Sequence, residues 1–146
     1  SLFDNPVFGF VIRACHSIPV DRGEADIGAI RAALAALAAG EGLLIFPEGT
    51  RTTPGSPLVF QRGPAHLMLA TRRPFLPVVI RCRPAALLKG QPWYHVPERR
   101  FELELEVLDE VPPDEWAPLV ADLPRPLAVR KLTRHLELFF MSKGDV

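Results

Sequence analysis

The sequence has few of the features that mark a metal, redox or nucleic-acid-binding protein. Its two cysteines, Cys15 and Cys82, form neither a C-x-x-C pair nor a Cys/His zinc spacing. Its 17 basic and 17 acidic side chains cancel, so no net field is available to gather a polyanion. We therefore expect no metal and no nucleic-acid partner, and we expect any anion site to be local.

Long apolar runs are also missing. No uninterrupted run approaches the roughly 18 to 20 residues that cross a bilayer as a helix. The first residues, Ser1-Leu2-Phe3-Asp4, do not have the basic and apolar regions of a signal peptide. We expect a soluble or peripheral chain. Residues 1–146 are expected to form one partial domain. The missing initiator Met suggests that further sequence precedes Ser1.

The apolar pattern that is present predicts alternating helices and strands. Helices are expected over 26–39 and 63–73, and buried strands over 43–46 and 75–82. Over 101–107, apolar residues alternate with glutamates, which predicts a strand near a sheet edge with one buried face. Helix, glycine and buried strand in this order indicate an α/β fold, namely a three-layer α/β/α domain with a mixed, largely parallel sheet, truncated at its N-terminal side.

The C-terminal part divides into a connection and a helix. Residues 109–124 are acidic and proline-rich, which favours a surface connection, whereas 125–141 carry apolar residues at helical spacing. This helix also carries five basic residues, Arg125, Arg130, Lys131, Arg134 and His135. They either lie against anionic lipid headgroups or form the solvated face of a helix packed on the sheet, and we favour the second.

The segment from Phe46 to Arg51 carries the chemistry. Gly49 lets backbone N–H groups approach an anion, Thr50 offers a hydroxyl, and Arg51 offers a guanidinium fork for phosphate oxygens. Glu48 is better placed to orient a cation than to bind phosphate. The alternative is an ordinary β-turn followed by a solvated arginine.

Three further segments decide between these alternatives: Ile18-Pro19-Val20-Asp21-Arg22-Gly23, Phe60-Gln61-Arg62-Gly63 and Pro77-Val78. With Phe46–Arg51, they resemble in order the glycerolipid acyltransferase family, whose best-known members make phosphatidic acid from lysophosphatidic acid. The resemblance covers roughly residues 1 to 80.

The resemblance implies roles for particular residues. Arg22 and the segment Glu48, Gly49, Thr50 and Arg51 would bind the phosphate of the acyl acceptor. Pro77 and Val78 would lie on the acyl-donor side. The family usually has a basic residue where this chain has Gln61, and Arg62 is expected to supply that charge unless it is a solvated surface residue.

The family's catalytic element is a histidine ahead of an aspartate, in the pattern His-x-x-x-x-Asp, upstream of the arginine-bearing segment. His16 and Asp21 reproduce this spacing, but they already belong to the segment that contains Arg22. Pro19 also opposes the helical turn that would bring the two side chains together. We therefore assign no catalytic residue to these 146 residues and expect the fragment to be inactive alone.

The resemblance implies an O-acyltransferase that moves a fatty acyl group from acyl-CoA or acyl-carrier protein to a lysophospholipid or glycerol-phosphate-type acceptor. It would need no cofactor or metal. It would act at the cytoplasmic side of a membrane, held peripherally or anchored through upstream sequence. Two alternatives remain: a non-catalytic lipid- or phosphate-binding module, and an unrelated enzyme that binds a small phosphorylated molecule with the same loop.

Overall fold

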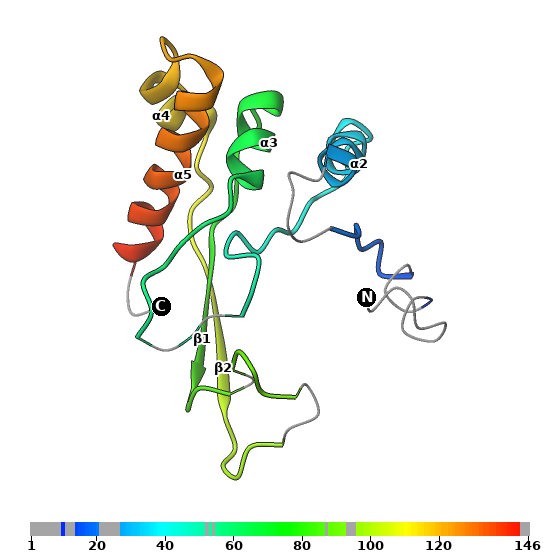
Figure 1. Ribbon diagram of the computed structural model, residues 1–146, viewed down its shortest axis with the longest axis vertical. Coiled ribbons are helices and arrows are strands. Elements are labelled where there is room, and N and C mark those ends of the chain that lie inside the picture. The colour runs from blue at the N-terminus through cyan, green and yellow to red at the C-terminus, as the bar shows by residue number, and fades with distance from the viewer. Residues whose placement is uncertain are drawn as a thin grey trace. The chain divides into compact units, whose positions relative to one another are not determined.

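The computed structural model describes residues 10, 14–20, 27–51, 53, 55–86, 88–92 and 96–143. The chain divides into two compact units, Ser1–Leu44 and Ile45–Val146. In the first unit, helix α2 spans Ile27–Ala38 (Figure 1). This confirms the helix predicted over 26–39, and the chain leaves it through Gly40, whose φ of 85° suits a residue without a side chain.

The predicted strand at 43–46 is wrong for the described residues. Leu43, Leu44, Ile45 and Phe46 lie in no strand, and the side chains of Leu44 and Phe46 are 76% and 61% exposed. A buried parallel strand needs neighbours that pair its N–H and C=O groups, and no described segment pairs with this one. The described residues do combine helices with a sheet, but its two strands are antiparallel. The three-layer, largely parallel arrangement stays a prediction.

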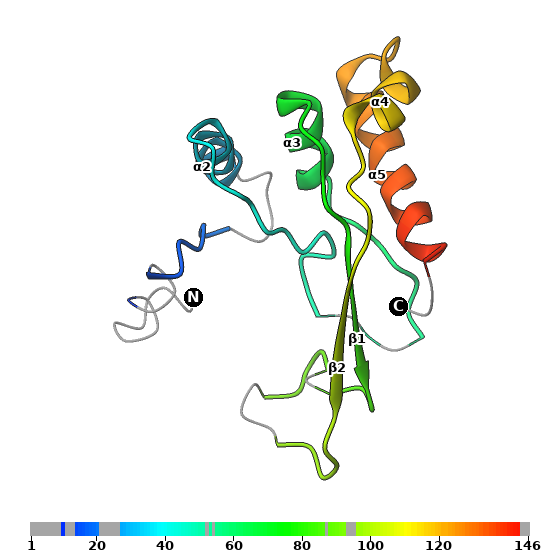
Figure 2. The same cartoon turned by 180° about the vertical axis from the view of Figure 1, so that it is seen from behind.

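The second unit contains three α-helices, one 3₁₀ helix and two strands among its described residues. Helix α3 spans Gly63–Thr71, strands β1 and β2 span Val78–Arg83 and Glu102–Val107, α4 spans Pro113–Trp116, η2 spans Ala117–Val120, and α5 spans Arg125–Met141. Figures 1 and 2 show α3 and α5 side by side. The helix predicted over 63–73 and a strand within 75–82 are therefore confirmed, and the alternating segment forms β2. The expected burial of the strand within 75–82 is wrong, because Val79 is the only buried residue of β1.

The core of this unit lies between its helices. It is built from ten buried residues: Phe60, Ala65, Met68, Val111, Trp116, Val120, Ala128, Val129, Leu132 and Leu136. The range 109–124, expected as a surface connection, contains α4 and η2 and contributes Trp116 and Val120 to this core. Pro113 supports the first of these turns because its fixed φ suits the start of a helix.

The two strands form an antiparallel ribbon with one apolar and one largely polar face. The pairs Val78–Val107, Ile80–Leu105 and Cys82–Leu103 share one face, and the intervening pairs place the three β2 glutamates on the other. The alternation is as predicted, but the burial is not: Leu103, Leu105 and Val107 are 56%, 59% and 62% exposed. No described element covers this face.

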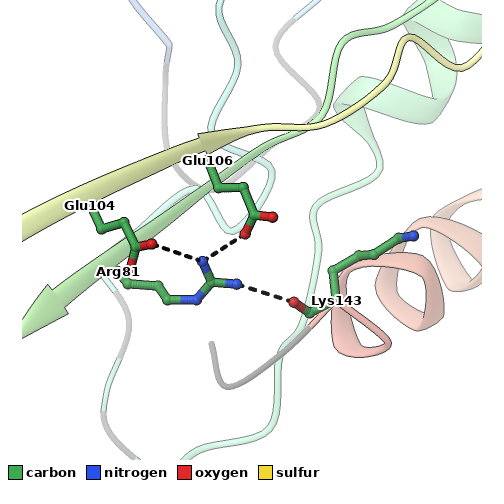
Figure 3. A network of polar contacts seen from close by, with 4 residues as sticks. All are labelled: Arg81, Glu104, Glu106 and Lys143. Carbon is green, nitrogen blue, oxygen red and sulfur yellow. Dashed lines mark hydrogen bonds and ion pairs between the residues drawn. The ribbon is translucent and has the colours of Figure 1, made fainter.

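The polar face is joined to the end of α5 (Figure 3). Arg81 donates through Nη1 to Oε2 of Glu106 at 2.7 Å and through Nη2 to the carbonyl oxygen of Lys143 at 3.2 Å. Glu104 Oε1 lies 4.0 Å from the same Nη1. The side chain of Arg81 is only 15% exposed, so this network fixes the ribbon against the C-terminal end of the helix.

Candidate functional site

A hydrogen-bonded turn opens the segment that was singled out for phosphate binding. The amide of Gly49 donates to the carbonyl oxygen of Phe46 at 3.1 Å, with Pro47 and Glu48 between them. Proline favours the second position of such a turn and glycine the fourth. Gly49 has a φ of 66°, a conformation that costs other residues about 1 to 2 kcal/mol. The turn delivers Thr50 and Arg51 to the surface, where both are exposed.

A second segment named by the resemblance lies directly against this turn. The amide of Gln61 donates to the carbonyl oxygen of Pro47 at 2.8 Å. A Cβ added to Gly49 would lie 2.9 Å from Cγ of Gln61, so the glutamine side chain fills the space that the glycine leaves. The structure thus brings Phe46–Arg51 and Phe60–Gly63 together, and Gln61 packs on the turn.

Arg62 follows at the start of α3, where it occupies the N-cap position and is exposed. Positive charge gathers around this point. The pKa of His66 is held below its usual value chiefly by burial, and further by the positive charges of Arg125 and Arg62. This local excess of positive charge suits an anion, although the chain as a whole is neutral.

Arg51 reaches across to the connection between the strands. Its Nη1 donates to the carbonyl oxygen of Gln91 at 3.1 Å. This contact orients the guanidinium and restricts the Arg51 side chain, so the side chain loses less conformational entropy when it binds a ligand. A guanidinium presents its N–H donors in a fixed fork, so contacts with a backbone carbonyl and with an anion are compatible.

The segment next to the turn is held by α5. The amide of Phe60 donates to Oε1 of Glu137 at 3.0 Å, and the Phe60 ring packs edge-on against Phe140 at 5.6 Å between centroids. The hydrogen bond from Phe60 holds the pKa of Glu137 below its usual value, with Arg134 adding to the effect against the opposing influence of burial. Glu137 was not predicted from the sequence. Its only signal was that α5 contains no other acidic residue.

The remaining predicted site residues are elsewhere or outside the described residues. Arg22 and Asp21 lie outside them. His16 is exposed, in a turn, with a φ of 54°. Pro77 is buried and its carbonyl oxygen accepts a hydrogen bond from the amide of Leu108 at 3.0 Å, while Val78 begins β1. The donor-side role of Pro77 and Val78 stays a prediction.

Comparison with known proteins gives a consistent result. Residues 1–81 match the model of the acyltransferase family. The chain is similar to the 1-acyl-sn-glycerol-3-phosphate acyltransferase of Limnanthes douglasii, with 29% identity over 114 residues, or 76% of this chain and 39% of the relative. It is 37% identical over 77 residues to the human 1-acyl-sn-glycerol-3-phosphate acyltransferase alpha, covering 51% of this chain and 25% of the relative. The Bacillus subtilis 1-acyl-sn-glycerol-3-phosphate acyltransferase is 34% identical over 76 residues, covering 52% and 37%.

The chain thus spans well under half the length of these curated relatives. No solved structure gave a significant match. The family match covers more than half of the chain, and it includes both segments that the structure brings together around Pro47. The chain belongs to the acyltransferase family.

Proposed function

We propose that this chain is part of an O-acyltransferase that moves a fatty acyl group from acyl-CoA or acyl-carrier protein to a lysophospholipid or glycerol-phosphate-type acceptor. The observation that carries the proposal is the hydrogen bond of 2.8 Å from the Gln61 amide to the Pro47 carbonyl oxygen, because it unites two segments of the family pattern in one surface site. The names of the relatives, 1-acyl-sn-glycerol-3-phosphate acyltransferases, indicate the acceptor class.

In this proposal the turn and its neighbours hold the acceptor's phosphate. The Thr50 hydroxyl and the Arg51 guanidinium donate to phosphate oxygens, and the backbone at Gly49 allows a close approach. Arg62 adds positive charge beside the turn, and Arg22 is assigned to the same phosphate by resemblance. The carboxylate of Glu48 would be repelled by phosphate, and its role is to orient a neighbouring cation.

The chemical step follows from the thioester. A histidine takes the proton from the acceptor hydroxyl, and the hydroxyl oxygen attacks the acyl carbonyl carbon. An ester C–O bond forms, the C–S bond breaks, and the proton passes to the departing thiol. We propose that the base comes from outside these 146 residues and that they are inactive alone. We assign His16 no such role, because it belongs to the segment that carries Arg22 and because Pro19 opposes the helical turn that would bring its side chain to Asp21.

Such an acceptor is carried by a bilayer, so we also propose peripheral contact with the cytoplasmic side of a membrane. Among the described residues, no helix has the length and apolar character needed to cross a bilayer.

The proposal is tested by removing the guanidinium. In the complete protein, Arg51→Ala should weaken binding of a short-chain 1-acylglycerol 3-phosphate by about 2 to 3 kcal/mol, because a hydrogen-bonded charge is lost. Binding of the matching 1-acylglycerol, which has no phosphate, should not change. Arg99→Ala, which removes an exposed arginine from the β1–β2 connection, serves as the matched control.

Equal affinity of the Arg51 variant and the wild type for the phosphate-bearing probe would overturn the assignment of the site. The catalytic part is tested separately by measuring acyl transfer. If the 146 residues alone transfer acyl groups and His16→Ala abolishes the transfer, the proposed external base is wrong. If the complete protein binds the probe but transfers nothing, the chain belongs to a non-catalytic binding module.

A further inference from the structure

We propose that Glu137 is a positioning residue for the phosphate-binding turn, acting through Phe60 and Gln61. The inference rests on the proposed function of that turn. Glu137 is the only acidic residue of α5, and its side chain is 12% exposed. A carboxylate this well covered, in a helix whose other charged side chains are all basic, needs a hydrogen-bond partner.

The partner is the amide of Phe60, which donates to Oε1 of Glu137 at 3.0 Å. Phe60 precedes α3 and lies in neither a helix nor a strand, so no regular backbone ladder uses this amide. An N–H group that is withdrawn from water and left without an acceptor destabilises the fold. The carboxylate therefore determines where the backbone of Phe60 can lie.

The position of Phe60 is passed to the turn by the next residue. The Gln61 amide donates to the Pro47 carbonyl oxygen at 2.8 Å, and the Gln61 side chain occupies the space beside Gly49. The two N–H groups belong to successive planar peptide units that meet at the Cα of Phe60, so a change in the φ or ψ angle of Phe60 turns one N–H group relative to the other and disturbs at least one of the two contacts. Glu137 is thus two hydrogen bonds away from the turn that delivers Thr50 and Arg51.

Two other contacts of this region do not explain why a carboxylate is needed at position 137. Arg134 donates to its second oxygen, Oε2, at 3.0 Å, but the arginine side chain is 62% exposed, and pairs at that exposure contribute little. The edge-on contact between Phe60 and Phe140 holds the ring of Phe60 but not the direction of its N–H group. The role assigned to Glu137 therefore depends on its acceptor oxygen.

The experiment compares four variants in the complete protein. Glu137→Gln keeps an acceptor oxygen in place, Glu137→Asp keeps the charge but withdraws the oxygen by one methylene, and Glu137→Leu removes the acceptor. Arg134→Gln is the matched control, because it removes only the exposed ion pair. Amide exchange at Phe60 and Gln61 is measured, together with binding of a short-chain 1-acylglycerol 3-phosphate and of the phosphate-free 1-acylglycerol.

We expect Glu137→Leu and Glu137→Asp to speed exchange at both amides and to weaken the phosphate-bearing probe roughly tenfold, the size of one lost hydrogen bond of about 1.4 kcal/mol. The affinity of these variants for the phosphate-free probe should not change. Glu137→Gln should keep most of the wild-type affinity for the phosphate-bearing probe, and Arg134→Gln should keep all of it. Unchanged exchange and affinity in the Leu and Asp variants would overturn the inference, and so would an equal loss for both probes, which would indicate general unfolding. If Arg51→Ala weakens the phosphate-bearing probe and the Glu137 variants do not, the positioning role alone fails. If Arg51→Ala also has no effect, the proposed site itself fails.

Discussion

The helical part of the second unit and its two-stranded ribbon use the same kind of apolar pattern with opposite results. In α5, Val129, Leu132 and Leu136 recur at helical spacing and are almost completely buried. In β2, Leu103, Leu105 and Val107 alternate as regularly, yet each is more than half exposed. A periodic apolar pattern therefore specifies which side chains share a face, whereas burial depends on whether another element packs on that face.

The largest expected effect comes from testing this difference directly with two leucines. Leu132→Ala should lower the free energy of unfolding by about 2 to 5 kcal/mol, because Leu132 is 0% exposed and its truncation leaves a cavity. Leu105→Ala, at a side chain that is 59% exposed, should change it by no more than about 0.5 kcal/mol. Denaturant unfolding of both variants measures the contrast. An equal cost at Leu105 would show that its face is covered in the protein.

A smaller effect is expected where the turn packs on Gln61. Gly49→Ala should cost about 1 to 2 kcal/mol for the positive φ alone, and more for the approach of the new Cβ to Gln61 at 2.9 Å. Gly55→Ala is the matched control, because Gly55 also has a positive φ, 76°, but nothing lies within 4 Å of its added Cβ. Unfolding free energies of the two variants should therefore differ.

A double variant separates the two causes. In the Gln61→Ala background, the new Cβ at position 49 no longer meets the glutamine side chain. If the contact with Gln61 matters, Gly49→Ala should lower the free energy of unfolding in that background by no more than Gly55→Ala lowers it in the wild type. If Gly49→Ala and Gly55→Ala cost the same from the start, the Gln61 side chain moves aside and does not support the turn.

The sequence predicted the local features of this molecule well. The apolar spacing and terminal glycine of α2 and the alternation in β2 both depend on residues close together in the chain. The predicted strand at 43–46 failed for the described residues because four apolar residues form a buried strand only when other strands pair with them. The same limit applies to the exposed face of β2.

The site could be predicted only as separate segments. The motifs identified Phe46–Arg51 and Phe60–Gly63, but the hydrogen bond between Gln61 and Pro47 is a tertiary contact that no local pattern encodes. Glu137 was missed for the same reason, because its role depends on the amide of Phe60, which is 77 residues away in the chain. The helices of 113–120 were missed because acidic residues and prolines also favour the first turn of a helix.

The smallest expected effect is a pH dependence of the stability that comes from one carboxylate of the helical part, Glu137. The pKa of Glu137 in the folded chain is lowered, first by the hydrogen bond from Phe60 and then by Arg134. A carboxyl group whose pKa is lower in the folded state favours folding when it is ionised, so its stabilising contribution is complete above the pKa of the unfolded chain. The contribution is lost as the pH falls through the lower pKa of the folded state. The free energy of unfolding, measured from neutral to acidic pH, should therefore be higher for the wild type than for Glu137→Gln at neutral pH, and the difference should disappear in this acidic window. A difference that does not vary with pH would mean that the carboxylate contributes by its shape and not by its charge.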